Sequence, residues 1–212
     1  MPVIVSILLN EIRSNAFRRI SQTLIYLPHF LSWIILAGIM IDLLSPNGGL
    51  VNRFLGLFGA EPIFFLGSNK WFRFTLVFTD VWKEFGFGTI VYLAAITNID
   101  PTQYEAATID GANRFQRIMH VTLPNMRMII VLMMVLSLGN VLNAGFDQVY
   151  NMYSEAVYPT GDILDTFIYR LSFKNGLWGQ SAAVSMFKSV VSTLFISVSY
   201  LCAYKFADYR VF

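Results

Sequence analysis

The sequence has very few of the residues that build metal centres, disulfide frameworks and nucleophilic active sites. It contains one cysteine, Cys202, and two histidines, His29 and His120, which lie far apart. These counts exclude a disulfide framework and a cysteine-based zinc site, and they leave no cluster of metal ligands. The sequence also lacks a Gly-x-x-x-x-Gly-Lys-Ser/Thr loop, so the chain is not expected to bind ATP itself.

Charge is scarce as well. Charged residues make up 13% of the 212 positions, whereas soluble domains have about 25%. The net charge is only +2 and the basic residues are scattered, which argues against nucleic acid as a partner. With 56% hydrophobic residues and a mean hydropathy of +0.57, the composition predicts an integral membrane protein.

Long apolar runs predict the membrane spans, because a helix needs about 20 residues to cross the hydrocarbon core. Four runs are long enough, at residues 24–44, 72–96, 126–146 and 180–201. Residues 1–9 are apolar but too short, and they read as the end of another span. The predicted fold class is therefore all-α, a polytopic transmembrane helical bundle. No linker or repeat divides it, so we expect a single domain over 1–212 with a core at 5–207.

The loops between these spans differ in their positive charge. Loops 10–23, 97–125 and 202–212, with Arg127 at the margin, carry eight basic residues, and loops 45–70 and 147–178 carry four. The positive-inside rule places the first set in the cytoplasm. The eight are Arg13, Arg18, Arg19, Arg114, Arg117, Arg127, Lys205 and Arg210, and the four are Arg53, Lys70, Arg170 and Lys174.

The loop at residues 97–125 has a pattern typical of two short helices. Asp100 is suited to cap a helix that has Pro101 as its first residue. Gly111 permits a break, and a second helix is expected from Ala112 to His120, ending before Pro124. From these residues alone, a mere amphipathic connector is the favoured interpretation.

The same loop contains Glu-Ala-Ala, three residues, Gly111, and later Val121-Thr122-Leu123-Pro124. This arrangement resembles the EAA signature of permease subunits of ATP-binding-cassette (ABC) importers, with Val121 where the pattern usually has Ile. Other stretches resemble the sugar branch of these permeases, carbohydrate uptake type 1. They are most similar to the LplB-like permeases for oligosaccharides and polysaccharide fragments. The stretches are residues 26–30, 45–50, 99–101 and 179–183.

The resemblance implies a type I importer permease that moves oligosaccharides or related sugars into the cytoplasm. It would be a multi-pass subunit in the cell membrane of a bacterium, surrounded by lipid. It implies three partners: a second homologous permease, a cytosolic ATP-binding subunit dimer and an extracellular solute-binding protein. ATP would bind the partner, with no cofactor on this chain, which would not be an enzyme. Such permeases typically have more spans, so the chain reads as N-terminally truncated. The resemblance also implies that the EAA loop couples the permease to the ATP-binding subunit. The positions that match this coupling loop are Glu105, Ala106, Ala107, Asp110, Gly111, Leu123 and Pro124.

Polar residues inside the spans are candidates for the substrate path. Charges at membrane depth usually face a bundle interior or a wet cavity, and flat aromatic rings suit sugar rings. One group, on the second span, is Asp80, Trp82, Lys83 and Glu84; the other, at the end of the third span, is Asn140, Asn143, Phe146 and Asp147. The alternatives are an ion pair that locks helices and hydrogen bonds between helices.

Several further expectations concern single residues. Lys188 is expected to neutralise Asp80 or Glu84, or to reach towards the interface. His29 is expected to be structural, and Arg73 to be an interfacial anchor.

Three rival functions stay open. A membrane enzyme would need a nucleophile–base pair or a metal cluster, which the scattered histidines and carboxylates do not supply. The other two are an importer permease for a non-sugar solute and a truncated, non-functional membrane fragment.

Overall fold

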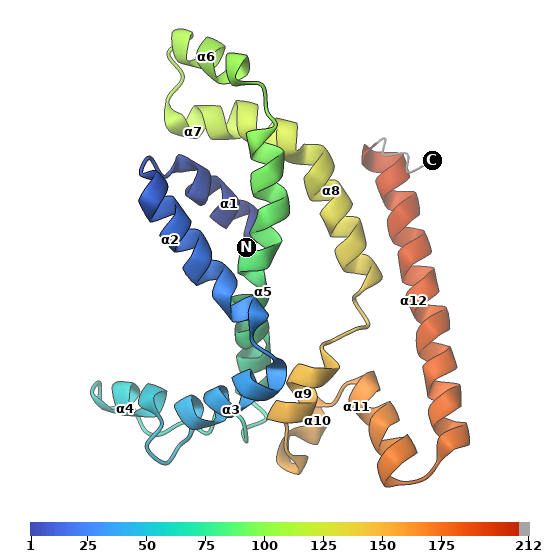
Figure 1. Cartoon of the computed structure of the whole chain (residues 1–212). Helices are drawn as coiled ribbons and strands as arrows, with labels where there is room; N and C mark the ends of the chain where they lie inside the picture. The colour runs from blue at the N-terminus through green and yellow to red at the C-terminus, as the bar shows by residue number, and fades with distance from the viewer. Residues whose placement is uncertain (208–212) are drawn as a thin grey trace. The chain divides into compact units, whose positions relative to one another are not determined.

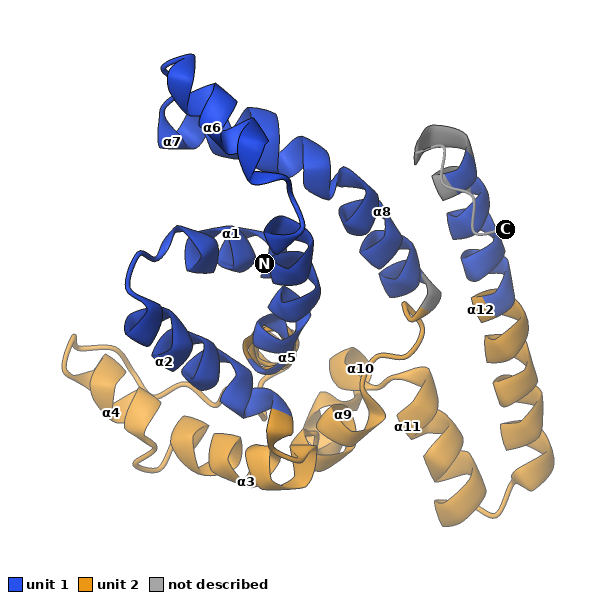
Figure 2. Cartoon of the chain, turned by 45° about the horizontal axis from the view of Figure 1, so that its top comes forward, with its two compact units in different colours: residues 1–29, 83–139, 193–212 blue, residues 30–82, 140–192 orange. Residues whose placement is uncertain are grey.

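The computed structural model describes residues 1–207, which contain helices and no β-strand. Arg210, used above to orient the chain, lies outside the described residues. Contacts between Cα atoms divide the chain into two compact units, residues 1–29, 83–139 and 193–212 and residues 30–82 and 140–192 (Figure 2). Each unit is described by itself, and a single permease domain over 1–212 stays a prediction.

The first unit contains the N-terminal helices, the later part of α5 and the segment that follows it (Figure 1). Its core is made by Tyr92 and Ile96 of α5 and Met126 of α8, with side chains of α1 packed against them. Gly86 allows α2 to approach α5, because a Cβ atom there would lie 2.0 Å from the backbone oxygen of Ile25. The elements are α1 (Pro2–Glu11), α2 (Asn15–Tyr26), α5 (Phe72–Thr97), α6 (Pro101–Ile109), α7 (Arg114–Arg117), the π turn η2 (Ile118–Thr122) and α8 (Leu123–Gly139).

The second unit contains short helices around the beginning of α5. Phe72 is fully buried in its core, with Ala37, Leu66, Met152 and Val157. The elements are α3 (Trp33–Leu44), α4 (Leu50–Gly56), α9 (Phe146–Met152), η3 (Glu155–Val157), α10 (Tyr158–Gly161), α11 (Leu164–Tyr169), the π turn η4 (Arg170–Lys174) and the first part of α12 (Trp178–Ala207). The 3₁₀ turn η1 (Leu27–Phe30) lies where the first unit passes into the second.

Two of the four predicted spans are single helices, since residues 72–96 match α5 and residues 180–201 match α12. By length and composition, two helical stretches of the described chain could cross a membrane, Arg114–Leu138 and Trp178–Leu201. A third is added if the bent pair Asn15–Phe30 and Trp33–Leu44 counts as one span. Helix α5 is not among them, and it carries four charged residues.

The prediction of one helix over residues 24–44 is wrong. The helical run of α2 and η1 breaks at Leu31 and Ser32 before α3 begins. Pro28 cannot donate a backbone hydrogen bond, and Ser32 starts a new helix by accepting from the backbone NH of Ile35 at 3.3 Å. The stretch 10–23, expected to be a polar loop, lies mostly in α1 and α2.

The predicted end of a helix before Pro124 is also wrong, since the helical stretch runs from Arg114 to Leu138. In the π turn η2, the NH of Leu123 bonds to the carbonyl of Ile118, five residues back. This wider turn accommodates a proline that would clash with the preceding turn of a regular α-helix. The span predicted at 126–146 therefore begins earlier, and it ends at Gly139.

Candidate functional site

The EAA segment forms a helical hairpin in the first unit, made of α6, a tight turn and α7 (Figure 1). Asp100 caps α6 by accepting from the NH of Thr102 at 2.9 Å, and this backbone hydrogen bond lowers the pKa of the Asp100 carboxyl. At the other end, the NH of Gly111 bonds to the carbonyl of Thr108 and the NH of Ala112 to that of Ala107.

These two bonds form a Schellman motif, which needs a residue with positive φ after the helix. Gly111 supplies it, with φ of 78°. Asn113 then caps α7 in a reciprocal capping box with Gln116. The break predicted at Gly111 is confirmed, and the local sequence explains both helix ends.

Three side-chain hydrogen bonds join α6 to the arm that follows the turn. Arg117 Nη1 donates to Thr108 Oγ1 at 3.1 Å, and the hydroxyls of Tyr104 and Thr122 lie 3.0 Å apart. The third joins Asn125 Nδ2 to Gln103 Oε1 at 2.8 Å. The hairpin is therefore a braced unit and not a loose connector.

The hairpin presents apolar side chains that nothing in the described chain covers. Ile109 is 87% exposed and Phe115 is 70% exposed. Large apolar side chains that are exposed outside the predicted spans are candidates for contact with another protein. Beside them is a hollow of about 330 Å³ whose lining includes Asp110, Gly111 and Arg117.

The predicted coupling residues fall into three places. Ala107, Asp110 and Gly111 line the hollow, and Glu105 and Ala106 lie on the exposed face of α6. Leu123 is half-buried and Pro124 is exposed at the start of α8. Their roles in coupling stay predictions. Sequence reasoning missed Ile109 and Phe115, because an exposed position cannot be told from a buried one in so short a helix.

The charges of α5 form a network in the first unit. Lys83 is 6% exposed, and its Nζ lies 2.9 Å from Glu84 Oε1 and 3.0 Å from the backbone oxygen of His29. Glu84 Oε2 is 2.8 Å from His29 Nδ1, and the His29 ring stacks on Phe87 at 4.0 Å between centroids. Lys83 and Glu84 thus tie η1 to α5. The structural role expected of His29 fits this position, but its partners, over 50 positions away, left no signal in the sequence.

Lys188 does not pair as predicted. Its Nζ lies 2.6 Å from Asp165 Oδ1, so Asp165 of α11 is its partner in place of Asp80 or Glu84. A side chain on α12 reaches the nearest carboxylate that the fold provides. The sequence does not reveal this partner, because it does not show that α11 and α12 lie side by side.

Another ion pair joins Asp162, the residue after α10, to Arg170 of η4. Arg170 Nη1 lies 2.8 Å from Asp162 Oδ1, its Nη2 contacts Oδ2, and Thr166 also donates to Asp162. Burial raises the pKa of Asp162, but the hydrogen bonds from Arg170 and Thr166 outweigh it and hold the pKa below its usual value. The same hydrogen bond to Asp162 is the main cause that raises the pKa of Arg170.

A hollow of about 440 Å³ in the second unit brings together two of the predicted path residues, Asp80 and Asn143. We call it the polar hollow because charged and amide side chains are among those that line it. Arg73, Gln148 and Asp162 also line it. Gln148 is 3% exposed, and its Nε2 donates at 2.8 Å to the carbonyl of Leu76 and to Thr79 Oγ1. Arg73, expected to be an interfacial anchor, donates through Nε to the carbonyl of Thr160 at 2.7 Å.

The other predicted path residues lie elsewhere. Trp82 lines a separate apolar hollow of about 540 Å³, also in the second unit. Asn140 Oδ1 accepts from Asn143, Phe146 stacks on Tyr150 at 5.3 Å between centroids, and the carbonyl of Asp147 accepts from Asn151. Whether any of these residues contacts substrate stays a prediction.

Comparison with known proteins decides the family. The family described as binding-protein-dependent transport system inner membrane component matches residues 1–211. The chain belongs to this family. The resemblance found in the EAA loop is thereby confirmed, and so is the class of transport permease subunit.

Two similar proteins come from Bacillus subtilis. The polygalacturonan/rhamnogalacturonan transport system permease protein YteP is 39% identical over the whole chain, and protein LplB is 41% identical. The chain spans 66% of the length of each.

A solved structure supports the fold. The crystal structure of a bacterial ABC transporter involved in the import of the acidic polysaccharide alginate matches with a TM-score of 0.93 and 36% identity. The match covers 97% of this chain and 72% of that one. A second structure of an alginate transporter, in complex with an alginate pentasaccharide-bound periplasmic protein, matches with the same TM-score and 37% identity, over 96% of this chain and 71% of that one. The all-α fold of a type I importer permease is therefore confirmed.

Proposed function

We propose that this chain is the permease subunit of an ATP-driven importer that moves saccharide chains into the cytoplasm. Its partners would be a second homologous permease, two copies of a cytosolic ATP-binding subunit and an extracellular solute-binding protein. The polar loop with the EAA hairpin would face the cytoplasm.

The braced hairpin is the observation that carries this proposal. Three hydrogen bonds join α6 to the arm that follows the turn, and the hairpin exposes Ile109, Phe115 and Glu105. A rigid projection with apolar anchors and a carboxylate can transmit a displacement of its partner to α5 and α8. A loose connector would absorb the same displacement. The hairpin is thus suited to couple a moving ATPase to the spans.

ATP hydrolysis would take place on the partner subunit, and this chain would bind no cofactor. The sequence contains no phosphate-binding glycine loop. Among the described residues no group of three or more His, Cys, Asp or Glu could hold a metal ion.

Saccharides are the proposed cargo because of the relatives. YteP is named for polygalacturonan and rhamnogalacturonan transport, and the alginate transporter imports an acidic polysaccharide. The alginate complex contains a periplasmic protein that carries a pentasaccharide, which supports an extracellular binding protein as a partner here.

Substitution of Gly111 tests the coupling role. A β-branched residue strains a backbone with φ of 78°, at a cost of about 1–2 kcal/mol. The space around it is open, so the strain would act on the turn and not on packing. We expect Gly111→Val in the assembled transporter to leave membrane insertion unchanged, to keep ATP hydrolysis and to reduce uptake about tenfold or more.

Gly111→Asn is the matched control, since Asn tolerates this backbone region, and it should retain most of the uptake. Normal uptake with Gly111→Val would contradict the proposed coupling role of the hairpin.

A further inference from the structure

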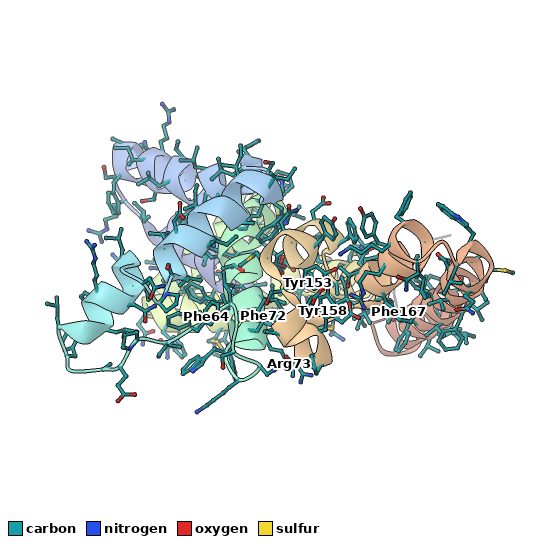
Figure 3. All side chains as sticks on the ribbon, turned by 90° about the horizontal axis from the view of Figure 1, so that it is seen from below. Phe64, Phe72, Arg73, Tyr153, Tyr158 and Phe167 are labelled. Carbon is teal, nitrogen blue, oxygen red and sulfur yellow. The ribbon has the colours of Figure 1, made fainter. Side chains whose placement is uncertain are left out.

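The polar hollow of the second unit has one cation among the residues that line it, Arg73. Arg73 is the second residue of α5 and lies next to the buried Phe72, as Figure 3 shows. A neighbouring hollow of about 680 Å³ shares Arg73 and Thr160 with the polar one, and Lys70 also lines it. Arg73 therefore stands at the border of two hollows in the same unit.

A chain of hydrogen bonds fixes the position of Arg73. Its Nε donates to the carbonyl of Thr160 at 2.7 Å, and the hydroxyl of Thr160 donates to Asn69 Oδ1 at 2.6 Å. Asn69 Nδ2 in turn donates to the carbonyl of Ala156 at 3.0 Å. These bonds join residues about 90 positions apart, so the guanidinium is held by the fold and not only by its own helix.

The bond through Nε leaves the outer edge of the guanidinium available. Among the described residues, no acceptor contacts its two terminal nitrogens, which carry four N–H donors. Such a planar fork matches the two oxygens of a carboxylate, and an arginine that is already held in place loses little entropy on binding.

We propose that Arg73 is a specificity-determining residue that binds a carboxylate of an acidic saccharide as it enters the polar hollow. This inference rests on the proposed function, and it names the substrate class that the same site would favour. A neutral saccharide would leave the terminal nitrogens without a charged partner, so it would bind less tightly.

The acidic residues that line the hollow are compatible with an anionic ligand. Asp162 is neutralised by its two contacts with Arg170. Asp80 lies seven residues beyond Arg73 on α5, which is about 10 Å along a helix. Asp80 therefore lies about two helical turns away from Arg73, and its carboxylate can accept hydrogen bonds from sugar hydroxyls.

The test measures uptake of two labelled probes of equal length by the complete transporter with its binding protein. The probes are a galacturonic acid trisaccharide and its methyl ester, which lacks the negative charges. We expect Arg73→Gln to reduce uptake of the acid about tenfold or more, since it removes a hydrogen-bonded charge pair. Uptake of the ester, normalised to the amount of assembled transporter, should fall much less than uptake of the acid. Arg73→Lys keeps the charge without the fork, so it should restore part of the uptake.

Lys174→Gln is the matched control, because it removes an exposed cation of the same unit that lines neither hollow. It should leave uptake of both probes unchanged. Unchanged uptake of the acid with Arg73→Gln would overturn the proposal. An equal loss for acid and ester would also overturn it, because it would assign Arg73 a merely structural role. A wild-type transporter that carries only the ester would reject the carboxylate and leave the proposed function intact, whereas one that carries neither probe would contradict both.

Discussion

The coupling hairpin and the polar hollow are built from contacts of very different range. In the hairpin, the side-chain bonds between the two arms join residues 9 to 22 positions apart. Around the hollow, the bonds that hold Gln148 and Thr160 to other segments join residues 69 to 91 positions apart, whereas the pair of Asp162 and Arg170 is local. One region is fixed by its own short sequence, and the other exists only when distant segments have packed.

The two regions also differ in burial. The bond between Arg117 and Thr108 in the hairpin is exposed, whereas Gln148 at the hollow is almost completely buried. A hydrogen bond that water can replace contributes little to stability, but a buried donor or acceptor without a partner is costly. Stability should therefore respond to changes at the hollow, and coupling should respond to changes in the hairpin.

The largest effect on stability is expected for Gln148→Leu. Leucine fills a similar volume but removes both donors to Leu76 and Thr79, which should destabilise the second unit by about 1–3 kcal/mol. The thermal unfolding midpoint of the purified transporter should fall, and its yield should decrease.

Gln103→Leu is the matched control in the hairpin. It removes one bond, from Asn125, at an exposed site, so the midpoint should stay close to that of the wild type. Equal shifts for the two variants would break the comparison, because stability would then not depend on the range and burial of the contacts.

A smaller effect is expected for Lys188→Met, which leaves the partly buried Asp165 without its partner on α12. We expect a loss of about 1–2 kcal/mol, between the values for exposed and fully buried pairs. The double variant with Asp165→Asn should recover part of this loss, because no unpaired charge is left. Additive losses in the double variant would show that the two side chains do not interact.

The sequence predicted the hairpin well because its signals are local. Asp100, Pro101 and Gly111 each act on neighbouring residues, and the structure has the first helix and its break at these positions. The continuation of the helix through Pro124 could not be predicted, because the π turn that accommodates the proline leaves no recognisable residue pattern.

The hollow was predicted only in part, for the same physical reason. Asp80 and Asn143 stood out as polar residues in apolar runs, but Arg73 and Gln148 have partners that only the fold reveals. The partner of Lys188 was assigned wrongly because hydropathy locates spans along the chain and says nothing of which residues face each other.

The smallest and most conditional effect concerns the ion pair of Asp162 and Arg170. Because the pKa of Asp162 in the folded chain is lowered below its ordinary 3.8, the pair contributes fully at neutral pH, and its contribution is lost as the pH falls through the lowered pKa. The difference in unfolding midpoint between the wild type and Asp162→Asn should therefore be constant from pH 7 to about pH 5 and decrease only at more acidic pH.

The hairpin bond of Arg117 has a hydroxyl as its acceptor, so it does not depend on the charge of a carboxylate. A difference that already shrinks between pH 7 and pH 5 would mean that Arg170 does not stabilise the ionised form of Asp162, and that this local pair does not support the hollow through its charge.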